Sequence, residues 1–162
     1  MILVAPDYIE QASGRLIGKD TAAQQNAVSG KFIFNSGDVI FSKIRPNLRK
    51  CILANFDGIC SSDMFVLTPI VQKVRAQFLL AILLSDAFTK YAVLNSKGTA
   101  FPRINRTAFE DFSIPLPPIS FQDEICKKLN QLNDISSELL INKENVHRLL
   151  SALLEVITED AP

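Results

Sequence analysis

Apolar residues recur at every seventh position in the C-terminal part of the chain, where no glycine or proline occurs from Phe121 until Pro162. The first row of this heptad pattern is Ile125, Leu132, Leu139, Val146 and Leu153, and a second row four residues later holds Leu129, Leu150 and Ile157. Ser136 and Lys143 interrupt the second row, which weakens a coiled coil but helps to fix its register. The pattern predicts one long coiled-coil helix over residues 120–158.

Local signals agree on where this helix begins. Pro117 and Pro118 cannot continue a helix backwards, and Ser120 is placed to cap it, with Asp123 and Glu124 in the first turn. A helix of roughly 38 residues is about 57 Å long. Because a small domain cannot cover so long an apolar seam, we expect a partner helix. Folding back onto the rest of the same chain stays open as the alternative.

The first 119 residues mix short apolar runs with turn residues. Strands are predicted at Met1–Ile9, Lys50–Ala54, Met64–Leu67 and Phe112–Leu116, and two more flank a turn at Asn35–Asp38. A second turn is predicted at Phe56–Gly58. One helix is predicted at Val74–Leu94 and a helical turn at Thr107–Phe109. Residues 10–30 are polar and predict a loop. The predicted fold is therefore α+β, with a mixed α/β domain over 1–119 followed by the long helix.

Composition refines this division. A chain of 162 residues with 48% apolar residues can fill one ordinary core. The formal net charge is zero, but residues 1–119 hold 13 Lys and Arg against 9 Asp and Glu, while residues 120–162 hold 4 against 8. The N-terminal domain is therefore basic and the helix acidic, and this asymmetry says more about partners than the total does.

The sequence offers little for catalysis. His147 is the single histidine, and neither a G-x-x-x-x-G-K-[ST] nor a G-x-G-x-x-G loop occurs. Cys51, Cys60 and Cys126 are odd in number and lack a C-x-x-C pair, so we expect buried thiols rather than disulfides or a zinc site. We expect no enzyme activity and no cofactor. The longest apolar run, Phe78–Leu84, is too short for a membrane span, so we expect a cytoplasmic protein without a membrane partner.

Two acid-free basic clusters are the most informative polar feature. One is S-K-I-R-P-N-L-R-K at Ser42–Lys50, and the other surrounds G-T-A-F-P-R-I-N at Gly98–Asn105. The candidate DNA contacts are Lys43, Arg45, Asn47, Arg49, Lys50, Lys97, Thr99, Arg103, Asn105 and Arg106. Lysines and arginines neutralise phosphates, and amide or guanidinium groups can read base edges. The alternative is that Arg45 and Arg103 are structural and that the exposed lysines are merely solvated.

Three motifs in order resemble the specificity (S) subunits of Type I restriction-modification systems. They are G-D-V-I-F-S-K-I-R-P at Gly37–Pro46, G-T-A-F-P-R-I-N at Gly98–Asn105 and I-P-L-P-P-I-S-F-Q-D-E-I at Ile114–Ile125. The third motif is similar to that family's passage from a target recognition domain into its long helix. The resemblance covers nearly the whole chain.

The resemblance implies a non-catalytic protein that recognises one half of a bipartite target in double-stranded DNA. The helix would pair antiparallel with a second such helix, in a homodimer or with another half-specificity chain. It would also dock the modification (methyltransferase) subunits, with the restriction subunit as a possible further partner. S-adenosylmethionine and ATP would belong to those partner subunits.

The chain departs from the family pattern in two ways. Family members usually carry two recognition domains and two helices, whereas this chain has one of each. Their recognition domains also tend to open with a segment that bears a tryptophan, and this chain contains none. Base-reading residues of the family vary with the target, so no individual contact is transferred from the resemblance.

Two other classes of function stay open. One is the recognition chain of a split DNA methyltransferase, and the other is a coiled-coil protein-interaction adaptor, which the zero net charge favours. Salt-dependent binding to duplex DNA separates the adaptor from the two DNA-binding classes, because binding through phosphates weakens steeply with salt.

Overall fold

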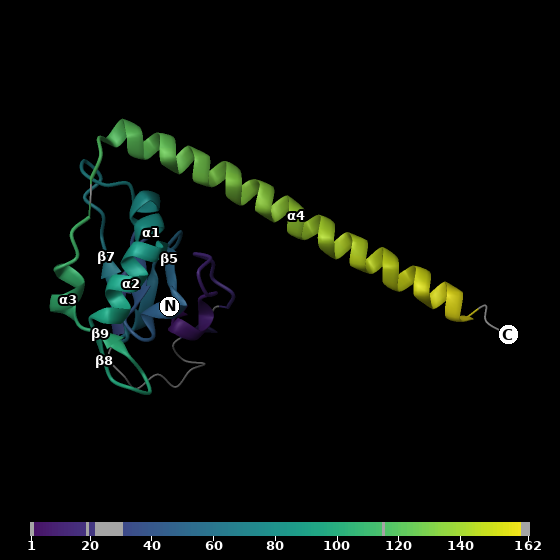
Figure 1. Ribbon diagram of the computed structural model, residues 1–162, viewed down its shortest axis with the longest axis horizontal. Coiled ribbons are helices and arrows are strands. Elements are labelled where there is room, and N and C mark those ends of the chain that lie inside the picture. The colour runs from purple at the N-terminus through teal and green to yellow at the C-terminus, as the bar shows by residue number, and fades with distance from the viewer. Residues whose placement is uncertain (1, 19, 22–30, 115, 160–162) are drawn as a thin grey trace. The chain divides into compact units, whose positions relative to one another are not determined.

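The chain divides into two compact units, which we call the head, Met1–Gln122, and the arm, Asp123–Pro162. The computed structural model describes the backbone of residues 2–18, 20–21, 31–114 and 116–159, and leaves out the side chains of residues 20–21, 140 and 142–159 (Figure 1).

The elements alternate short strands with helices. In chain order they are β1 (Ile2–Val4), the 3-10 helix η1 (Pro6–Tyr8), β2 (Asp20–Thr21), β3 (Lys31–Phe34), β4 (Val39–Ser42), the 3-10 helix η2 (Pro46–Leu48), β5 (Cys51–Leu53), β6 (Gly58–Ser61), β7 (Met64–Leu67), α1 (Ala76–Leu84), α2 (Asp86–Leu94), β8 (Ser96–Lys97), β9 (Arg103–Ile104), α3 (Arg106–Glu110) and α4 (Ile119–Glu159).

The strands form two sheets and a hairpin. The first sheet has the order β2-β1-β6-β3, in which β1 and β6 run parallel and the other neighbours antiparallel. The second sheet is antiparallel, with β4 between β5 and β7. Strands β8 and β9 form an antiparallel hairpin, and β9 also bridges to Ile44 beyond the end of β4. The predicted turn at Asn35–Asp38 therefore carries the chain from β3 in one sheet to β4 in the other.

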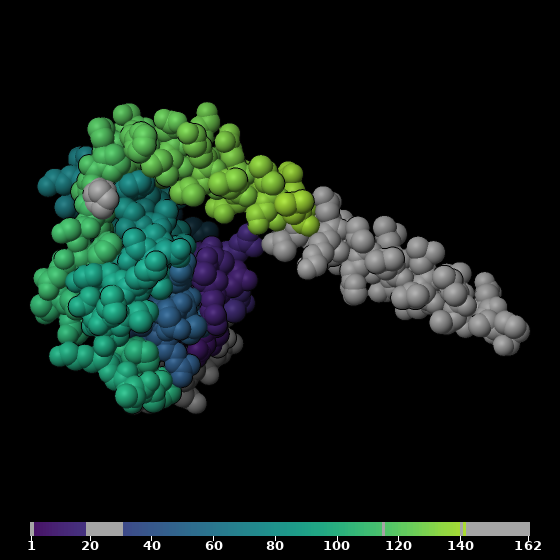
Figure 2. Space-filling model, in the orientation of Figure 1, coloured from purple at the N-terminus to yellow at the C-terminus, as the bar shows by residue number. Residues whose placement is uncertain are grey.

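Strand β4 lies at the centre of the head and is buried along its whole length. Because successive side chains of a strand point to opposite faces, Ile40 packs into one hydrophobic cluster with Val4, and Val39 and Phe41 pack into a second cluster. The second cluster also contains residues of α1, α2 and β9. Figure 2 shows α1 and α2, in teal, in the middle of one face of the head.

The predicted single helix over Val74–Leu94 is two helices, because Ser85 interrupts it. The Ser85 side chain accepts a hydrogen bond from the Phe88 amide (3.2 Å) and caps α2, and Asp86 places an acid in the first turn. These are N-cap signals inside an otherwise helical run.

Among the described residues no single helix is long and apolar enough to cross a membrane. Only α1 and α2 taken together reach the required length and apolar composition, and the two helices are bent by 60° relative to each other.

Strand β6 begins at Gly58, the last residue of the predicted turn at Phe56–Gly58. A Cβ atom on Gly58 would lie 2.8 Å from the Ile2 carbonyl oxygen and 2.7 Å from the Phe34 ring. Glycine is therefore used here for close packing between neighbouring strands, which a sequence pattern does not distinguish from turn formation.

The predicted strand at Phe112–Leu116 is wrong, since its described residues form no strand. Phe112 instead packs its ring against Phe88 and Tyr91, with centroid separations of 5.0 and 4.9 Å. Prolines at 115, 117 and 118 remove the backbone donors that a strand needs. The predicted N-terminal strand is also shorter than expected, because Pro6 begins η1 after Val4.

The first turn of α4 belongs to the head, and Gln122 holds it there. Its side chain is 0% exposed, accepts from the Arg75 amide (2.9 Å) and donates to the carbonyls of Lys73 (3.0 Å) and Pro117 (2.8 Å). A buried amide with every partner satisfied fixes backbone segments that are distant in sequence. The helix begins at Ile119, one residue before the predicted start, so Ser120 lies inside it.

The predicted heptad seam is exposed where its side chains are described in the middle of α4. Leu132 and Leu139 are 62% and 63% exposed, and Ile135 and Ile141 are also exposed, whereas Ile125 and Leu129 are half-buried. Val146, Leu150, Leu153 and Ile157 belong to the helix, but their side chains lie outside the described residues.

Candidate nucleic-acid interface

Backbone hydrogen bonds join the two basic clusters of the sequence into one surface. The Arg45 amide donates to the Pro102 carbonyl (2.7 Å), and the Ile104 amide donates to the Lys43 carbonyl (3.1 Å). Residues 43–45 therefore lie along β9 of the hairpin, which places Lys43 and Arg45 beside Arg103.

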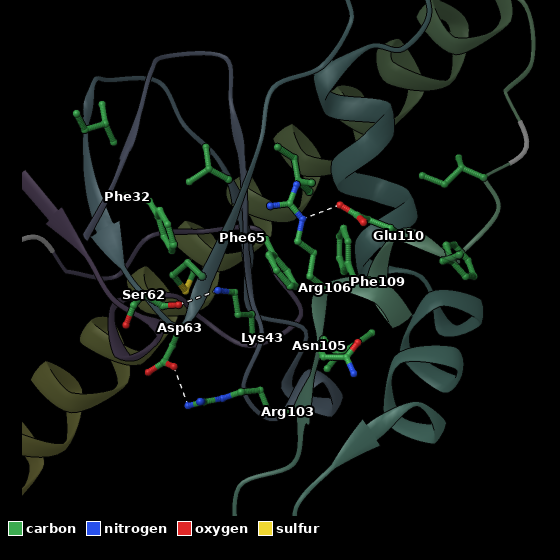
Figure 3. Close-up of a pocket in the computed structure, with 17 residues that line it drawn as sticks. Phe32, Lys43, Ser62, Asp63, Phe65, Arg103, Asn105, Arg106, Phe109 and Glu110 are labelled. Atoms are coloured by element: carbon green, nitrogen blue, oxygen red, sulfur yellow. Dashed lines mark hydrogen bonds and ion pairs between the residues drawn. The ribbon is translucent and has the colours of Figure 1, made fainter. Parts of the chain in front are cut away.

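A cavity of about 780 Å³ opens next to this surface. Figure 3 shows the residues that line it. Four phenylalanine rings, Phe32, Phe65, Phe109 and Phe112, line it together with basic residues, and Figure 3 labels the first three. Phe65 and Phe109 lie against each other with their centroids 4.7 Å apart, and Phe32 is partly exposed. The cavity thus combines an aromatic lining with a basic border.

Lys43 supplies a fixed positive charge in this cavity (Figure 3). Its Nζ donates to the Ser62 carbonyl (2.8 Å) and lies 4.6 and 5.2 Å from the ring centroids of Phe65 and Phe32. Burial lowers the pKa of Lys43, Asp63 opposes that shift, and the nearby cation Arg103 adds to it. Lys43 and Arg103 therefore lie close enough to contribute to one positive field.

Two arginines at the border of the cavity pair with carboxylates, of which Glu110 is exposed and Asp63 is half-buried. Arg103 pairs with Asp63 (2.7 Å), and Arg106 pairs with Glu110 (2.7 Å), one helical turn further along α3. Hydrogen bonding to Glu110 raises the pKa of Arg106. Exposed ion pairs contribute little to stability, so a phosphate could replace either carboxylate at low cost.

Two other candidate DNA contacts, Arg49 and Lys50, already bind groups of the head with their side chains. Arg49 donates to the Leu84 carbonyl (3.3 Å) and pairs with Asp86, and it has a left-handed backbone with φ 50°. Lys50 donates through Nζ to the Pro6 carbonyl (2.7 Å). Their donors tie η2 and β5 to other elements, so they are the least available of the predicted DNA contacts.

The remaining candidates differ in availability. Asn47 is exposed on η2, Lys97 is exposed on β8, and Thr99 is exposed in the hairpin. The Asn105 side chain caps α3 by accepting from the Ala108 amide (2.8 Å), so its oxygen already has a structural role.

The sequence interpretation missed three residues of this surface. Phe101 lies inside a basic motif but carries no charge, and Phe32 was assigned only to a strand. Asp63 has no sequence signal for its place beside Arg103, because that contact is long-range.

The described side chains show no arrangement that favours metal or thiol chemistry. No group of three or more His, Cys, Asp or Glu residues among them could hold a metal ion. All three cysteines are buried thiols outside any disulfide, and their burial agrees with the sequence prediction. Burial raises the pKa of Cys60 to about 11 and that of Cys51 further still, so both thiols are protonated at neutral pH.

The head thus has the character of a binding domain that offers a basic, aromatic-lined surface on a rigid core. The family model described as the Type I restriction modification DNA specificity domain matches residues 16–146. The chain belongs to this family, which confirms the resemblance of its three motifs.

Named relatives agree with this assignment. The chain is 37% identical over 131 residues to the Type I restriction enzyme EcoDI specificity subunit of Escherichia coli, a match that covers 81% of this chain and 29% of that relative. It is 29% identical over 115 residues to the MjaVIII specificity subunit of Methanocaldococcus jannaschii, covering 70% of this chain and 26% of the relative. The chain therefore spans about a third or less of the length of these relatives.

Two solved structures share the fold. The HsdS subunit from Thermoanaerobacter tengcongensis matches with a TM-score of 0.72 and 25% identity, over 85% of this chain and 37% of that one. A chain from a structural study of complex assembly and conformational transition in the type I R-M system matches with a TM-score of 0.77 and 23% identity, over 99% of this chain and 43% of that one. The second match bears on the fold alone, and together they confirm the predicted α+β class.

The contacts of Arg49 predict a loss of stability on its removal. Arg49→Ala should lower the free energy of unfolding of the head by roughly 1 to 2 kcal/mol, because it removes a charged donor from the Leu84 carbonyl and from Asp86. Arg106→Ala is the control, and it should leave the free energy of unfolding nearly unchanged because the pair of Arg106 with Glu110 is exposed.

Chemical denaturation followed by tyrosine fluorescence measures this difference, because both tyrosines, Tyr8 and Tyr91, lie in the head. Equal stabilities of the two variants would contradict the structural role of Arg49.

Proposed function

We propose that the head binds double-stranded DNA and recognises one half of a bipartite target, as the specificity component of a Type I restriction-modification system. The observation that carries this proposal is the pairing of residues 43–45 with 102–104, which makes one basic surface from two clusters. The names of the relatives, all specificity subunits, support it.

The chemistry of the surface suits a polyanion. Arg103 and Arg106 are more than half exposed, and their partners Asp63 and Glu110 are half-buried and exposed, so both arginines can exchange carboxylate for phosphate. Lys97 and Asn47 are exposed and can add a phosphate contact and a base contact. Charge attraction would hold the protein on DNA of any sequence, and contacts with base edges would select the target.

We further propose that the long helix, predicted over 120–158, pairs antiparallel with a second helix and docks methyltransferase subunits. The exposed seam residues Leu132 and Leu139 support this, because exposed leucines in heptad register are typical of an interface. The partner helix would come from a second copy or from another half-specificity chain. In this account the chain catalyses nothing, and cofactor chemistry belongs to its partners.

Salt dependence tests DNA binding. The logarithm of the wild-type affinity for duplex DNA should fall linearly with the logarithm of salt concentration, by about 0.9 per phosphate contact. Arg103→Ala/Arg106→Ala should weaken binding to all sequences and reduce the magnitude of this slope by about 2. Fluorescence anisotropy with a labelled duplex at several salt concentrations measures both effects.

A control variant that loses the same number of positive charges elsewhere on the head distinguishes the proposed surface from an effect of net charge. Lys73→Ala/Lys90→Ala removes two exposed cations from other parts of the head and should leave the slope nearly unchanged. An equal loss in both double variants would mean that total charge, rather than the proposed surface, drives binding. Absence of salt-dependent binding by the wild type would contradict DNA recognition itself.

Arm length should set the spacing between two half-sites. A two-fold dimer prefers an inverted-repeat target with a fixed gap. Deleting the heptad Glu138–Glu144 should bring the heads about 10 Å closer, which corresponds to roughly three base pairs. Selection of preferred sites from random duplexes measures the gap for both proteins.

Deletion of four residues is the control, because it breaks the heptad phase and should weaken the dimer instead of shortening the gap. An unchanged gap after the seven-residue deletion, or a wild-type monomer in sedimentation at micromolar concentration, would show that the helix does not space two identical heads.

A further inference from the structure

Arg45 is bound differently from the other arginines proposed to contact DNA. Arg49, Arg103 and Arg106 each pair with a carboxylate. Within the described part of the chain, no group accepts a hydrogen bond from the Arg45 guanidinium, which instead lies over the Phe101 ring at 4.6 Å from its centroid. Because a cation–π contact uses none of the guanidinium N–H groups as hydrogen-bond donors, these groups stay available to a ligand.

The backbone conformation on both sides restricts where this cation–π pair lies. Arg45 has a left-handed conformation with φ 48°, which is strained for a residue with a side chain, and its amide is fixed by the Pro102 carbonyl. In the hairpin Gly98 has φ +100°, and a Cβ atom there would lie 3.2 Å from the Phe101 carbonyl oxygen. Phe101 is 62% exposed, so burial in the core does not explain its position.

We propose that Arg45 is a specificity-determining residue that reads a guanine of the target, and that Phe101 is its positioning residue. The inference rests on the proposed function and deepens it. An arginine with a free N–H edge can donate to both O6 and N7 of guanine in the major groove, where a two-stranded hairpin also fits. The cation–π contact orders the guanidinium before binding, which lowers the entropy cost of the base contact.

The exposed ring favours a base over a phosphate as the ligand of Arg45. A phosphate is strongly hydrated, and an apolar ring beside it would displace water without replacing its hydrogen bonds. Base edges in the major groove include the thymine methyl group, which is a favourable neighbour for a phenylalanine ring. The Arg45–Phe101 pair therefore matches a guanine with an apolar neighbour better than it matches the DNA backbone.

The first test compares preferred duplexes selected from a random-sequence library. The wild type should require guanine at one position of each half-site. Phe101→Ala and Arg45→Gly should lose that preference and keep those at other positions, without loss of thermal stability, because Phe101 is exposed and glycine accepts the left-handed backbone of Arg45. Ile70→Ala, with a 57% exposed side chain, is the matched control and should select the wild-type site.

The second test replaces that guanine by 7-deazaguanine, which lacks the N7 acceptor. Wild-type affinity should fall by about 5- to 10-fold, as expected for half of a bidentate contact. The affinity of Phe101→Ala should change less than about twofold, because the ordered contact is already lost.

The remaining outcomes of the two tests distinguish an error in the guanine assignment from an error in the proposed DNA binding. A selected site without guanine, or a wild type insensitive to 7-deazaguanine, overturns the guanine assignment while DNA binding stands. If Arg45→Gly binds all sequences more weakly and to the same extent, Arg45 contacts a phosphate, and the guanine assignment is wrong. A wild type that binds no duplex at all contradicts the proposed function itself.

Discussion

The pairing of residues 43–45 with 102–104 is the constraint on which the candidate interface depends. Two backbone hydrogen bonds, from Arg45 to Pro102 and from Ile104 to Lys43, bring together segments that α1 and α2 separate in the sequence. Without this pairing the head would carry two separate groups of cations. With it, Lys43, Arg45 and Arg103 share one surface beside an aromatic-lined cavity.

The core explains why this pairing is well defined. Strand β4 is buried between two hydrophobic clusters and ends directly before Lys43, so the basic segment continues from one of the most restrained strands of the head. Ile104 of β9 is fully buried in the second of those clusters. Both sides of the paired segment are therefore anchored by hydrophobic packing, which leaves the exposed charges in a fixed arrangement.

The sequence predicted the features that local patterns specify and missed those that depend on distant contacts. The heptad rows predicted α4, and the apolar runs predicted β4, β5 and β7. Gly58 looked like a turn because its role is close packing against Ile2 and Phe34. In the site, the basic clusters were visible as composition, but neither the pair of Arg49 with Asp86 nor that of Arg103 with Asp63 leaves a signal in local sequence.

Amide hydrogen exchange of the full chain, with and without duplex DNA, tests the central statement that this joined surface is where DNA binds. Our account predicts slower exchange on DNA binding in residues 43–47 and 97–106, which are adjacent only in the folded head, and little change in β1 and η1. Protection confined to other segments, or protection of only one of the two basic segments, would contradict it.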